Sequence, residues 1–488
     1  MRRQSSVACF LSALLTAAIV HGHADRVAHA AETPGIEALA DGLVAESLER
    51  NAELKGVQAT VAQRLAALDV ARAHYLPAID VQMRYSRADG GRQIDFPVGD
   101  LLNPVYSTLN KLLAAQGRPA QFPQIKNESI ALLRPEEQEA FVRLTQPLFD
   151  LRLTAGVRGR AAELRAETEG MQAFRSRLAR DVRQAWYRWL RARQSLAILD
   201  ATVELSAANL RINESLSRNG KITHDLVLRA EADLLEIEET RLAVRNGVTL
   251  AQAYVNLLRN RPQDTALPDA SVSDRDVELA RQCLAQRVGN AALARGPLQE
   301  LAARQRCELT RLDAALAAAQ AGEDLARATF WPQLALAVDA GAQGENLEFD
   351  SNSPFVLASV VLRFNVFSGG ADLAALNQAR AVSAELHAAR DQVAQSINLE
   401  VLDALQIFEV AYVSLRTAEK RVAAADGAFT IAEKKRDLGQ INQTEFIDSR
   451  RALTDAQLNR NLTRFAALSQ LAALEYAVGG PTPAKENP

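Results

Sequence analysis

Two stretches of the chain have the apolar spacing of very long helices. No proline occurs within residues 148–261 or 355–480. Within residues 160–217 the apolar positions recur every three, four or seven residues, as they do in a coiled coil. A continuous helix of about 60 residues would be roughly 90 Å long. The spacing predicts long helices over about 153–217 and 371–436.

Each long helical pattern ends at a glycine and is followed by a second helical pattern. Gly220 and Gly439 interrupt the apolar spacing, and a threonine soon after each glycine can cap the next helix. We therefore expect a tight turn at each glycine. Returning helices are expected over about 224–260 and 444–478.

Alternation of apolar and polar residues, the pattern of strands, is confined to a few short segments. It is clearest in residues 78–87 and 333–343, which both follow a proline. Return strands are expected over about 141–149 and 355–367. Such short segments of period two are typical of outer-membrane barrel strands, with apolar side chains toward lipid and polar ones toward the lumen. A soluble hairpin with one buried face has the same pattern, so the alternation alone leaves both open.

The same unit occurs twice along the chain. Residues 208–223 align with 427–442 at an offset of 219, and in both copies a strand pattern passes into a long helical pattern. The copies therefore share order as well as composition. The predicted domains are a first repeat (31–257), an inter-repeat equatorial segment (258–296), a second repeat (297–480) and a disordered tail (481–488).

Residues 1–30 have the pattern of a secretory signal peptide. Arg2 and Arg3 precede a short apolar core over 7–20, and residues 28–30 form a small-x-small cleavage site. We expect the mature chain to begin at Ala31. Beyond this segment there is no run of about 18 apolar residues, so any membrane crossing would be made by strands.

Charge and motifs argue against nucleic-acid binding and against catalysis. The formal net charge is −3, which gives no electrostatic attraction to nucleic acid. Only His74, His224 and His387 lie beyond the predicted signal peptide, and they are far apart. The sequence has no Gly-rich phosphate loop, nucleophile elbow or CxxC pair. We expect no enzymatic activity, no cofactor and no metal.

Two cysteines flank a predicted turn between helices in the inter-repeat region. Cys283 and Cys307 lie on either side of Gly289, Gly296 and Pro297. A disulfide across this turn and two separate thiols both fit the spacing, because spacing alone does not fix the geometry.

Four strands per chain make an oligomer necessary if the strands enter a membrane. The smallest membrane barrels have about eight strands, and an open sheet edge is not tolerated in lipid. Either the strands belong to a soluble domain, or several chains pool them.

The sequence resembles the TolC family of outer-membrane efflux proteins. The resemblance rests on the duplicated strand–helix unit, on HYLPAI (74–79) and TFWPQL (329–334) before the two hairpins, and on FNVFSGG (364–370) after the second. It covers nearly the whole mature chain. It implies a mainly α fold with a small β part: a trimeric twelve-strand membrane β-barrel that continues into a periplasmic α-helical barrel.

The resemblance implies an exit duct in the outer membrane with a large periplasmic part. Such a homotrimer would pass small molecules from a periplasmic adaptor and an inner-membrane pump, here of the resistance-nodulation-division type. A type I duct for protein secretion has the same fold and stays open. A periplasmic coiled-coil adaptor or scaffold fits less well, because adaptors have a single hairpin between flanking β-rich domains.

In this family the periplasmic helix turns close the pore and contact the adaptor. Glu445 and Asp448 match the family's aperture acids, and Asp225 lies near the matching place in the first repeat. Three copies of each would form carboxylate rings that favour cations. Alternatively, acids in a first helical turn complement the helix dipole. The expected adaptor-docking residues are Asn219, Gly220, Lys221, Ile222, Leu438, Gly439, Gln440 and Ile441.

The turns also depart from the family pattern. Arg436 stands where the family has an aromatic residue, and Ile441 where it has a basic one. In the first repeat Leu226 occupies a position that is often acidic. The resemblance therefore supports the predicted position of the aperture more strongly than it supports the identity of the residues that close it.

The connection over 88–140 is much longer than the loop of the second hairpin. Residues 105–117 within it can form a short helix. We expect an extracellular loop over the barrel mouth, since outer loops are the long ones in such barrels. It could shield the opening, or it could be variable surface decoration.

Overall fold

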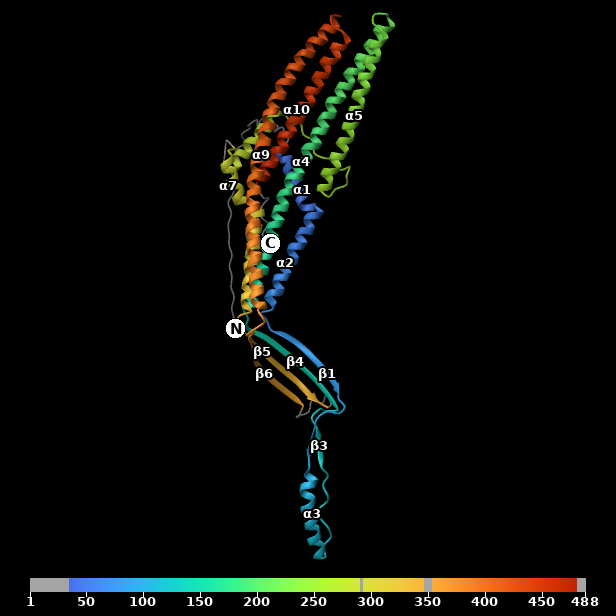
Figure 1. The fold of residues 1–488 in the computed structure, drawn as a ribbon. Coiled ribbons are helices and arrows are strands. Elements are labelled where there is room, and N and C mark those ends of the chain that lie inside the picture. The colour runs from blue at the N-terminus through green and yellow to red at the C-terminus, as the bar shows by residue number, and fades with distance from the viewer. Residues whose placement is uncertain (1–34, 290–292, 346–352, 481–488) are drawn as a thin grey trace, which may run out of the picture.

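The computed structural model describes residues 35–289, 293–345 and 353–480. The predicted signal peptide and the predicted tail lie outside these residues. A bundle of long helices forms one end of the molecule, a four-stranded sheet follows, and a slender extension forms the other end (Figure 1). No helix in the described part is long and apolar enough to cross a membrane.

The helices are α1 (Ile36–Arg50), α2 (Ala52–Ala73), α3 (Val98–Ala115), α4 (Leu151–Arg218), α5 (His224–Leu258), α6 (Asp274–Arg287), α7 (Arg295–Gln305), α8 (Cys307–Ala328), α9 (Ala371–Asp437) and α10 (Gln443–Ala477). The strands are β1 (Ala78–Arg87), β2 (Gln93–Phe96), β3 (Glu128–Ala131), β4 (Glu136–Phe149), β5 (Gln333–Gly344) and β6 (Pro354–Arg363). The predicted mainly α fold with a small β part is therefore confirmed.

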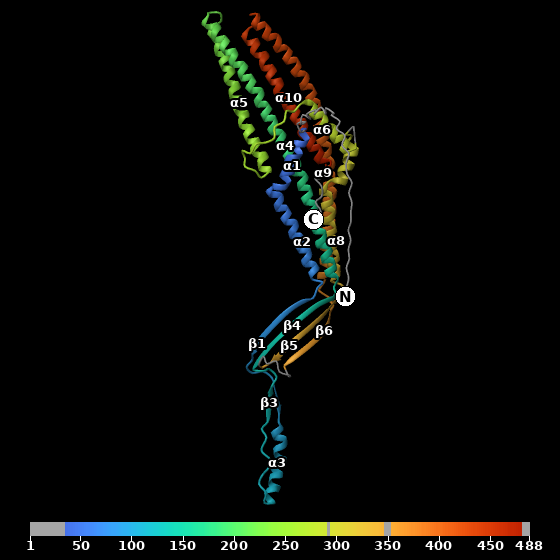
Figure 2. The ribbon, with the colours of Figure 1, turned by 180° about the vertical axis from the view of Figure 1, so that it is seen from behind.

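Two helical hairpins dominate the bundle. Helices α4 and α9 have 68 and 67 residues, and they return as α5 and α10, so that both hairpin turns lie at the same end (Figures 1 and 2). The core lies midway along the bundle, where α4 packs against α10. Trp186 of α4 is fully buried there, and its Nε1 donates to the carbonyl oxygen of Pro268 at 3.1 Å. Phe465 and Leu468 of α10 join the same core.

Helices α2 and α8 extend the bundle toward the sheet, and the sequence pattern does not predict them. Each packs along α4, and each is followed by a proline that leads into a strand. Both are rich in alanine, and their apolar residues are not gathered on one strong stripe. Their place therefore depends on the helix beside them rather than on their own periodicity.

The sheet is antiparallel in the order β1-β4-β5-β6. Ile79, Val81, Met83 and Tyr85 of β1 lie on one face and are exposed. According to the strand register, the same face includes residues 142 and 144 of β4, residues 336, 338 and 340 of β5, and residues 356, 358, 360 and 362 of β6. One side of the sheet is thus an apolar surface that no part of the described chain covers.

The opposite face of the sheet carries paired charges, together with apolar residues such as Leu357 and Val361 of β6. Arg143 lies between Asp80 and Asp339 in the register, and its guanidinium binds the Asp339 carboxylate at 2.7 Å. Arg84 pairs with Glu139 at 2.9 Å. The alternation in the sequence therefore places these ion pairs on the face opposite the apolar one, as is typical of barrel strands.

Two strand boundaries differ by several residues from the sequence prediction. β4 begins at residue 136 rather than 141, because it follows β1 along its whole length. β6 ends at Arg363 rather than 367. Beyond Arg363 the chain turns into α9. In this turn the side-chain amide of Asn365 donates to the Asp372 carboxylate at 2.8 Å. Gly369 and Gly370 have positive φ in this turn.

The long connection over 88–135 is folded. β2 and β3 pair as a ribbon that continues away from the sheet and carries α3 (Figure 2). The sequence predicts a short helix over 105–117 but not the ribbon. Helix α3 begins earlier than expected, at Val98, despite the proline within it.

The inter-repeat region has two helices, α6 and α7, and no disulfide. Cys283 and Cys307 are not bonded to each other. Glu278 of α6 accepts hydrogen bonds from Arg281 (3.0 Å), Gln282 (3.0 Å) and, across to α9, the Tyr412 hydroxyl (2.5 Å). Mainly through the Arg281 hydrogen bond, these contacts lower the pKa of Glu278 to about 2.

The Glu278 contact predicts an acid-sensitive attachment of α6 to α9. Because the folded-state pKa is lowered, the stabilisation is complete above pH 4.5 and is lost as the pH falls toward 2. The protection of the α6 amides, taken relative to the intrinsic exchange rate at each pH, should therefore fall between pH 6 and pH 3 in the parent. Glu278→Gln should remove most of this pH-dependent loss of protection, and equal profiles for the two proteins would contradict the assignment.

Gly341 is the position in the sheet where a side chain is least tolerated. A Cβ there would lie 2.5 Å from Phe141 Cβ and 2.1 Å from the Ala140 carbonyl oxygen. Gly341→Ala should therefore destabilise the sheet by about 1–3 kcal/mol. Thermal unfolding in detergent, followed by circular dichroism, measures the change.

Gly427→Ala is the matched control, since a Cβ at this helical glycine meets no atom within 4 Å. It should raise stability by up to about 1 kcal/mol through helix propensity. If both substitutions shift unfolding in the same direction, the close approach at Gly341 is not the cause.

Candidate functional site: the hairpin turns

The two hairpin turns have the same backbone geometry. Gly220 and Gly439 have φ of 67° and 70°, a region that favours glycine. The amide of Lys221 donates to the Leu216 carbonyl at 3.0 Å, and that of Gln440 donates to the Lys435 carbonyl at 2.8 Å. Both are Schellman-type ends that satisfy the last carbonyls of the long helices.

Most of the residues expected to dock an adaptor are exposed at these turns. Leu438, an apolar side chain at the tip of the second hairpin, is 70% exposed. Ile222 and Ile441 occupy matching places after the two glycines and are half-buried. The exposed remainder comprises Asn219, Gly220, Lys221, Gly439 and Gln440.

The predicted aperture acids also lie near the turns. Glu445 and Asp448 are exposed, three residues apart on one face of α10, and Asp225 is exposed at the start of α5. The Glu445 amide donates to Asn442 Oδ1 at 2.8 Å. Asn442 therefore caps the helix. The Glu445 carboxylate is exposed on the surface of the tip.

Arg436 packs on an aromatic ring at the second turn. Its guanidinium carbon lies 4.5 Å from the centre of the Phe446 ring, and Phe446 in turn packs against Phe429 at 5.7 Å. The turn thus has an aromatic residue, but on α10 rather than before the glycine. Phe446 is fully buried and links α9 to α10.

Charged side chains tie the two hairpins together just behind the turns. Asp233 of α5 binds Arg450 of α10 at 2.8 and 2.9 Å, and Arg451 reaches the same carboxylate at 3.0 Å. The Asp233 and Arg450 side chains are only 4% and 3% exposed. Closer to the tip, Arg229 donates to the Thr444 hydroxyl at 3.2 Å.

Sequence reasoning does not find this cluster. One signal is present: Arg450 lies on the buried stripe of α10 between Phe446 and Leu453. A charge at such a position needs a partner, because an unpaired buried charge is strongly destabilising. The identity of the partner is not encoded nearby, since Asp233 is 217 residues away.

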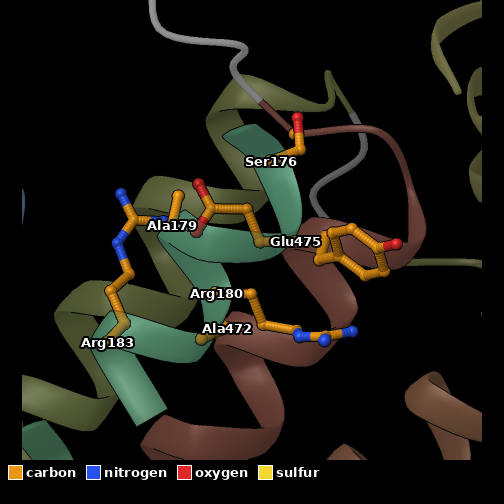
Figure 3. Close-up of a pocket in the computed structure, with 8 residues that line it drawn as sticks. Ser176, Ala179, Arg180, Arg183, Ala472 and Glu475 are labelled. Carbon is orange, nitrogen blue, oxygen red and sulfur yellow. Dashed lines mark hydrogen bonds and ion pairs between the residues drawn. The ribbon is translucent and has the colours of Figure 1, made fainter. Parts of the chain in front are cut away.

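A second charged cluster lies far from the turns, where α4 and α10 pack together. The Glu475 carboxylate is directed toward the Arg183 guanidinium at 2.7 Å (Figure 3). Arg287 of α6 also binds Glu475, and Arg183 binds Asp41 of α1 at 2.6 Å. The small pocket beside Glu475 is therefore lined by charges that are already paired, and the cluster joins four helices.

Groups suited to a metal ion are absent from the described residues. No three His, Cys, Asp or Glu side chains come together there in a suitable arrangement. The turn acids are exposed rather than convergent.

Comparison with known families decides between a channel and an adaptor. The sequence profile described as outer membrane efflux protein matches residues 43–260 and 298–480. The chain belongs to the outer membrane efflux protein family. The predicted resemblance and outer-membrane localisation are confirmed. The two matched segments each contain one hairpin and one pair of sheet strands.

Members of the outer membrane efflux family and their solved structures resemble the chain at low identity. The pyoverdine export outer membrane protein OpmQ of Pseudomonas putida is 28% identical over 276 residues, which cover 56% of this chain. The match spans 58% of the length of OpmQ. CusC has a similar structure, with a TM-score of 0.73, 16% identity, and coverage of 92% of this chain and 93% of its own.

The CmeC outer membrane channel of Campylobacter jejuni gives a TM-score of 0.72. It is 15% identical, and the match covers 90% of this chain and 85% of CmeC. At such identities the likeness establishes the fold. The family is one of transport proteins, in agreement with the prediction that the chain is not an enzyme.

Asp233→Asn should loosen the two hairpins near their turns. It leaves Arg450 buried beside a neutral amide, and breaking a buried ion pair costs about 3–5 kcal/mol. Hydrogen exchange of α5 and α10 over the first three helical turns should accelerate strongly, while the sheet stays unchanged.

The matched control is Asp200→Asn, because Asp200 pairs with Arg241 in a more exposed ion pair. Exposed pairs contribute less than about 1 kcal/mol, so exchange there should change little. Equal effects of the two substitutions would show that burial of Asp233 is not what holds the hairpins.

Proposed function

We propose that the chain is one protomer of a homotrimeric exit duct in the outer membrane. The observation that carries this proposal is the sheet, which has a continuous apolar face and two edges, β1 and β6, without a neighbour in the described chain. Unpaired backbone groups are not tolerated in lipid, so such a sheet must be closed by further copies.

The geometry of the sheet suits closure by rotation. Strand directions alternate from β1 to β6, so β6 of one copy and β1 of the next would again be antiparallel. Both edge strands have ten residues. Three copies would give twelve strands, with the apolar face toward lipid and the paired charges of Arg143 and Asp339 toward the lumen.

The hairpin turns would be the periplasmic end of the duct. Their residues, from Asn219 to Ile222 and from Leu438 to Ile441, would form the surface offered to a periplasmic adaptor. The adaptor would connect the duct to an inner-membrane pump, for which we propose the resistance-nodulation-division type. Leu438 would supply an exposed apolar contact on this surface.

The cargo we propose is small molecules. OpmQ is named for the export of pyoverdine, which favours this class over proteins. The ion pairs on the inner face of the sheet suit a water-filled passage. A type I duct for protein secretion would have the same fold, and transport of candidate cargoes in cells with the matching pump separates the two.

The acids of the turns would form the aperture. Glu445 and Asp448 from three copies would give two carboxylate rings near the narrow end. At the repeat offset of 219, Arg229 is the first-repeat residue that corresponds to Asp448. Asp225, exposed at the start of α5, would add a third acid at the tip.

Conductance in planar bilayers tests the duct and its aperture together. The parent should give discrete channels that divalent cations block from the periplasmic side. Glu445→Ala/Asp448→Ala should weaken the block, because the carboxylate rings that attract cations are removed. Absence of channels in a folded, membrane-inserted parent would contradict the duct itself.

A control variant must change charge equally without touching the tip. Glu238→Ala/Glu239→Ala removes two exposed acids per chain from the middle of α5. Block by divalent cations should stay near the parent value in this variant. If both variants shift the block alike, general surface charge explains it and the aperture assignment fails.

A further inference from the structure

The extension beyond the sheet carries an apolar helix face that nothing in the described chain covers. Helix α3 (Val98–Ala115) is carried by the β2–β3 ribbon at the end of the molecule farthest from the hairpin turns (Figure 1). Leu101, Val105 and Leu112 are 70%, 53% and 58% exposed. Such exposed apolar surface on a folded, ordered helix indicates an interaction site.

The exposed face has the spacing of a coiled-coil seam. Leu101, Val105, Thr108, Leu112 and Ala115 follow one another at intervals of four, three, four and three residues, and all five are exposed. These intervals define alternating d and a positions of a heptad. The seam runs from Leu101 to Ala115, the last residue of α3.

The back of the helix is fixed by its own chain. Asn103 and Asn110, seven residues apart and opposite the seam, bind the backbone of the returning segment at Ile125 and Phe122. Tyr106 packs against Phe122 at 5.3 Å between ring centres. The returning segment therefore holds α3 in one orientation, with the seam outward.

We propose that the seam binds α3 of the other copies of this chain, so that three extensions join at the outer mouth of the duct. This inference rests on the proposed trimer. The extension emerges directly from β1, the edge strand that would pair with the next copy. Association of the extensions thus continues the proposed strand interface beyond the sheet.

Symmetry and charge favour a second copy as the occupant. Rotation about a threefold axis makes the three α3 helices parallel and offers the same seam from each. The charged residues of α3 are Asp100 and Lys111, and neither lies on the seam. An 18-residue helix pair would be weak alone, but assembly of the sheet raises the effective concentration of the helices.

Cysteine cross-linking in the full-length protein tests this arrangement. In a Cys283→Ser/Cys307→Ser background, Val105→Cys places a thiol on the seam, and Ala114→Cys places one on an exposed position off the seam. A short bis-maleimide applied to the assembled protein should give covalent dimers with Val105→Cys and almost none with Ala114→Cys. Similar yields at the two positions would overturn the proposal.

A second substitution checks that the seam itself causes the cross-link. Adding Leu112→Asp to Val105→Cys should lower the yield roughly tenfold, since it places like charges where the seam would meet. Native mass spectrometry should still show a trimer, because the sheet is untouched. A trimer without a Val105→Cys cross-link contradicts only the seam. Loss of the trimer in the background protein itself contradicts the proposed duct as well.

Discussion

An open sheet edge in hydrocarbon is the constraint on which the rest of the molecule depends. Each backbone group left without a partner there costs several kcal/mol. In the described residues the four-stranded sheet has two edges without a neighbour, β1 and β6, and an exposed apolar face. Closure by further copies would satisfy the edges, and it would also set the long helices of those copies side by side as the wall of one passage.

The two ends of that passage are built differently. At the hairpin turns, backbone geometry is fixed by Gly220 and Gly439, and the buried Asp233 carboxylate binds the two hairpins together behind them. The acids lie in front of this cluster and stay exposed. At the opposite end, α3 presents a continuous apolar seam. A charged, exposed end suits regulated contact with ions and partners, whereas an apolar seam suits permanent association.

The sequence pattern predicts those features of the fold that depend on neighbouring residues, and it misses those that depend on residues far away in the chain. The long helices, the strands and the turn glycines depend on near neighbours, so the periodicity finds them. Helices α2 and α8 are missed because their burial depends on α4, and the ribbon that carries α3 has only four residues per strand. The partnership of Asp233 with Arg450 joins distant parts of the chain, so only the buried arginine could have signalled it.

The most direct measurement is a disulfide scan between β1 and β6. Within one chain these strands are separated by β4 and β5, about 14 Å in all, which is beyond the reach of a disulfide. In a background without Cys283 and Cys307, Val81→Cys combined in turn with cysteine at each position of 356–362 should give covalent trimers at one register. Folded protein that forms no such bond at any register would contradict closure by three copies.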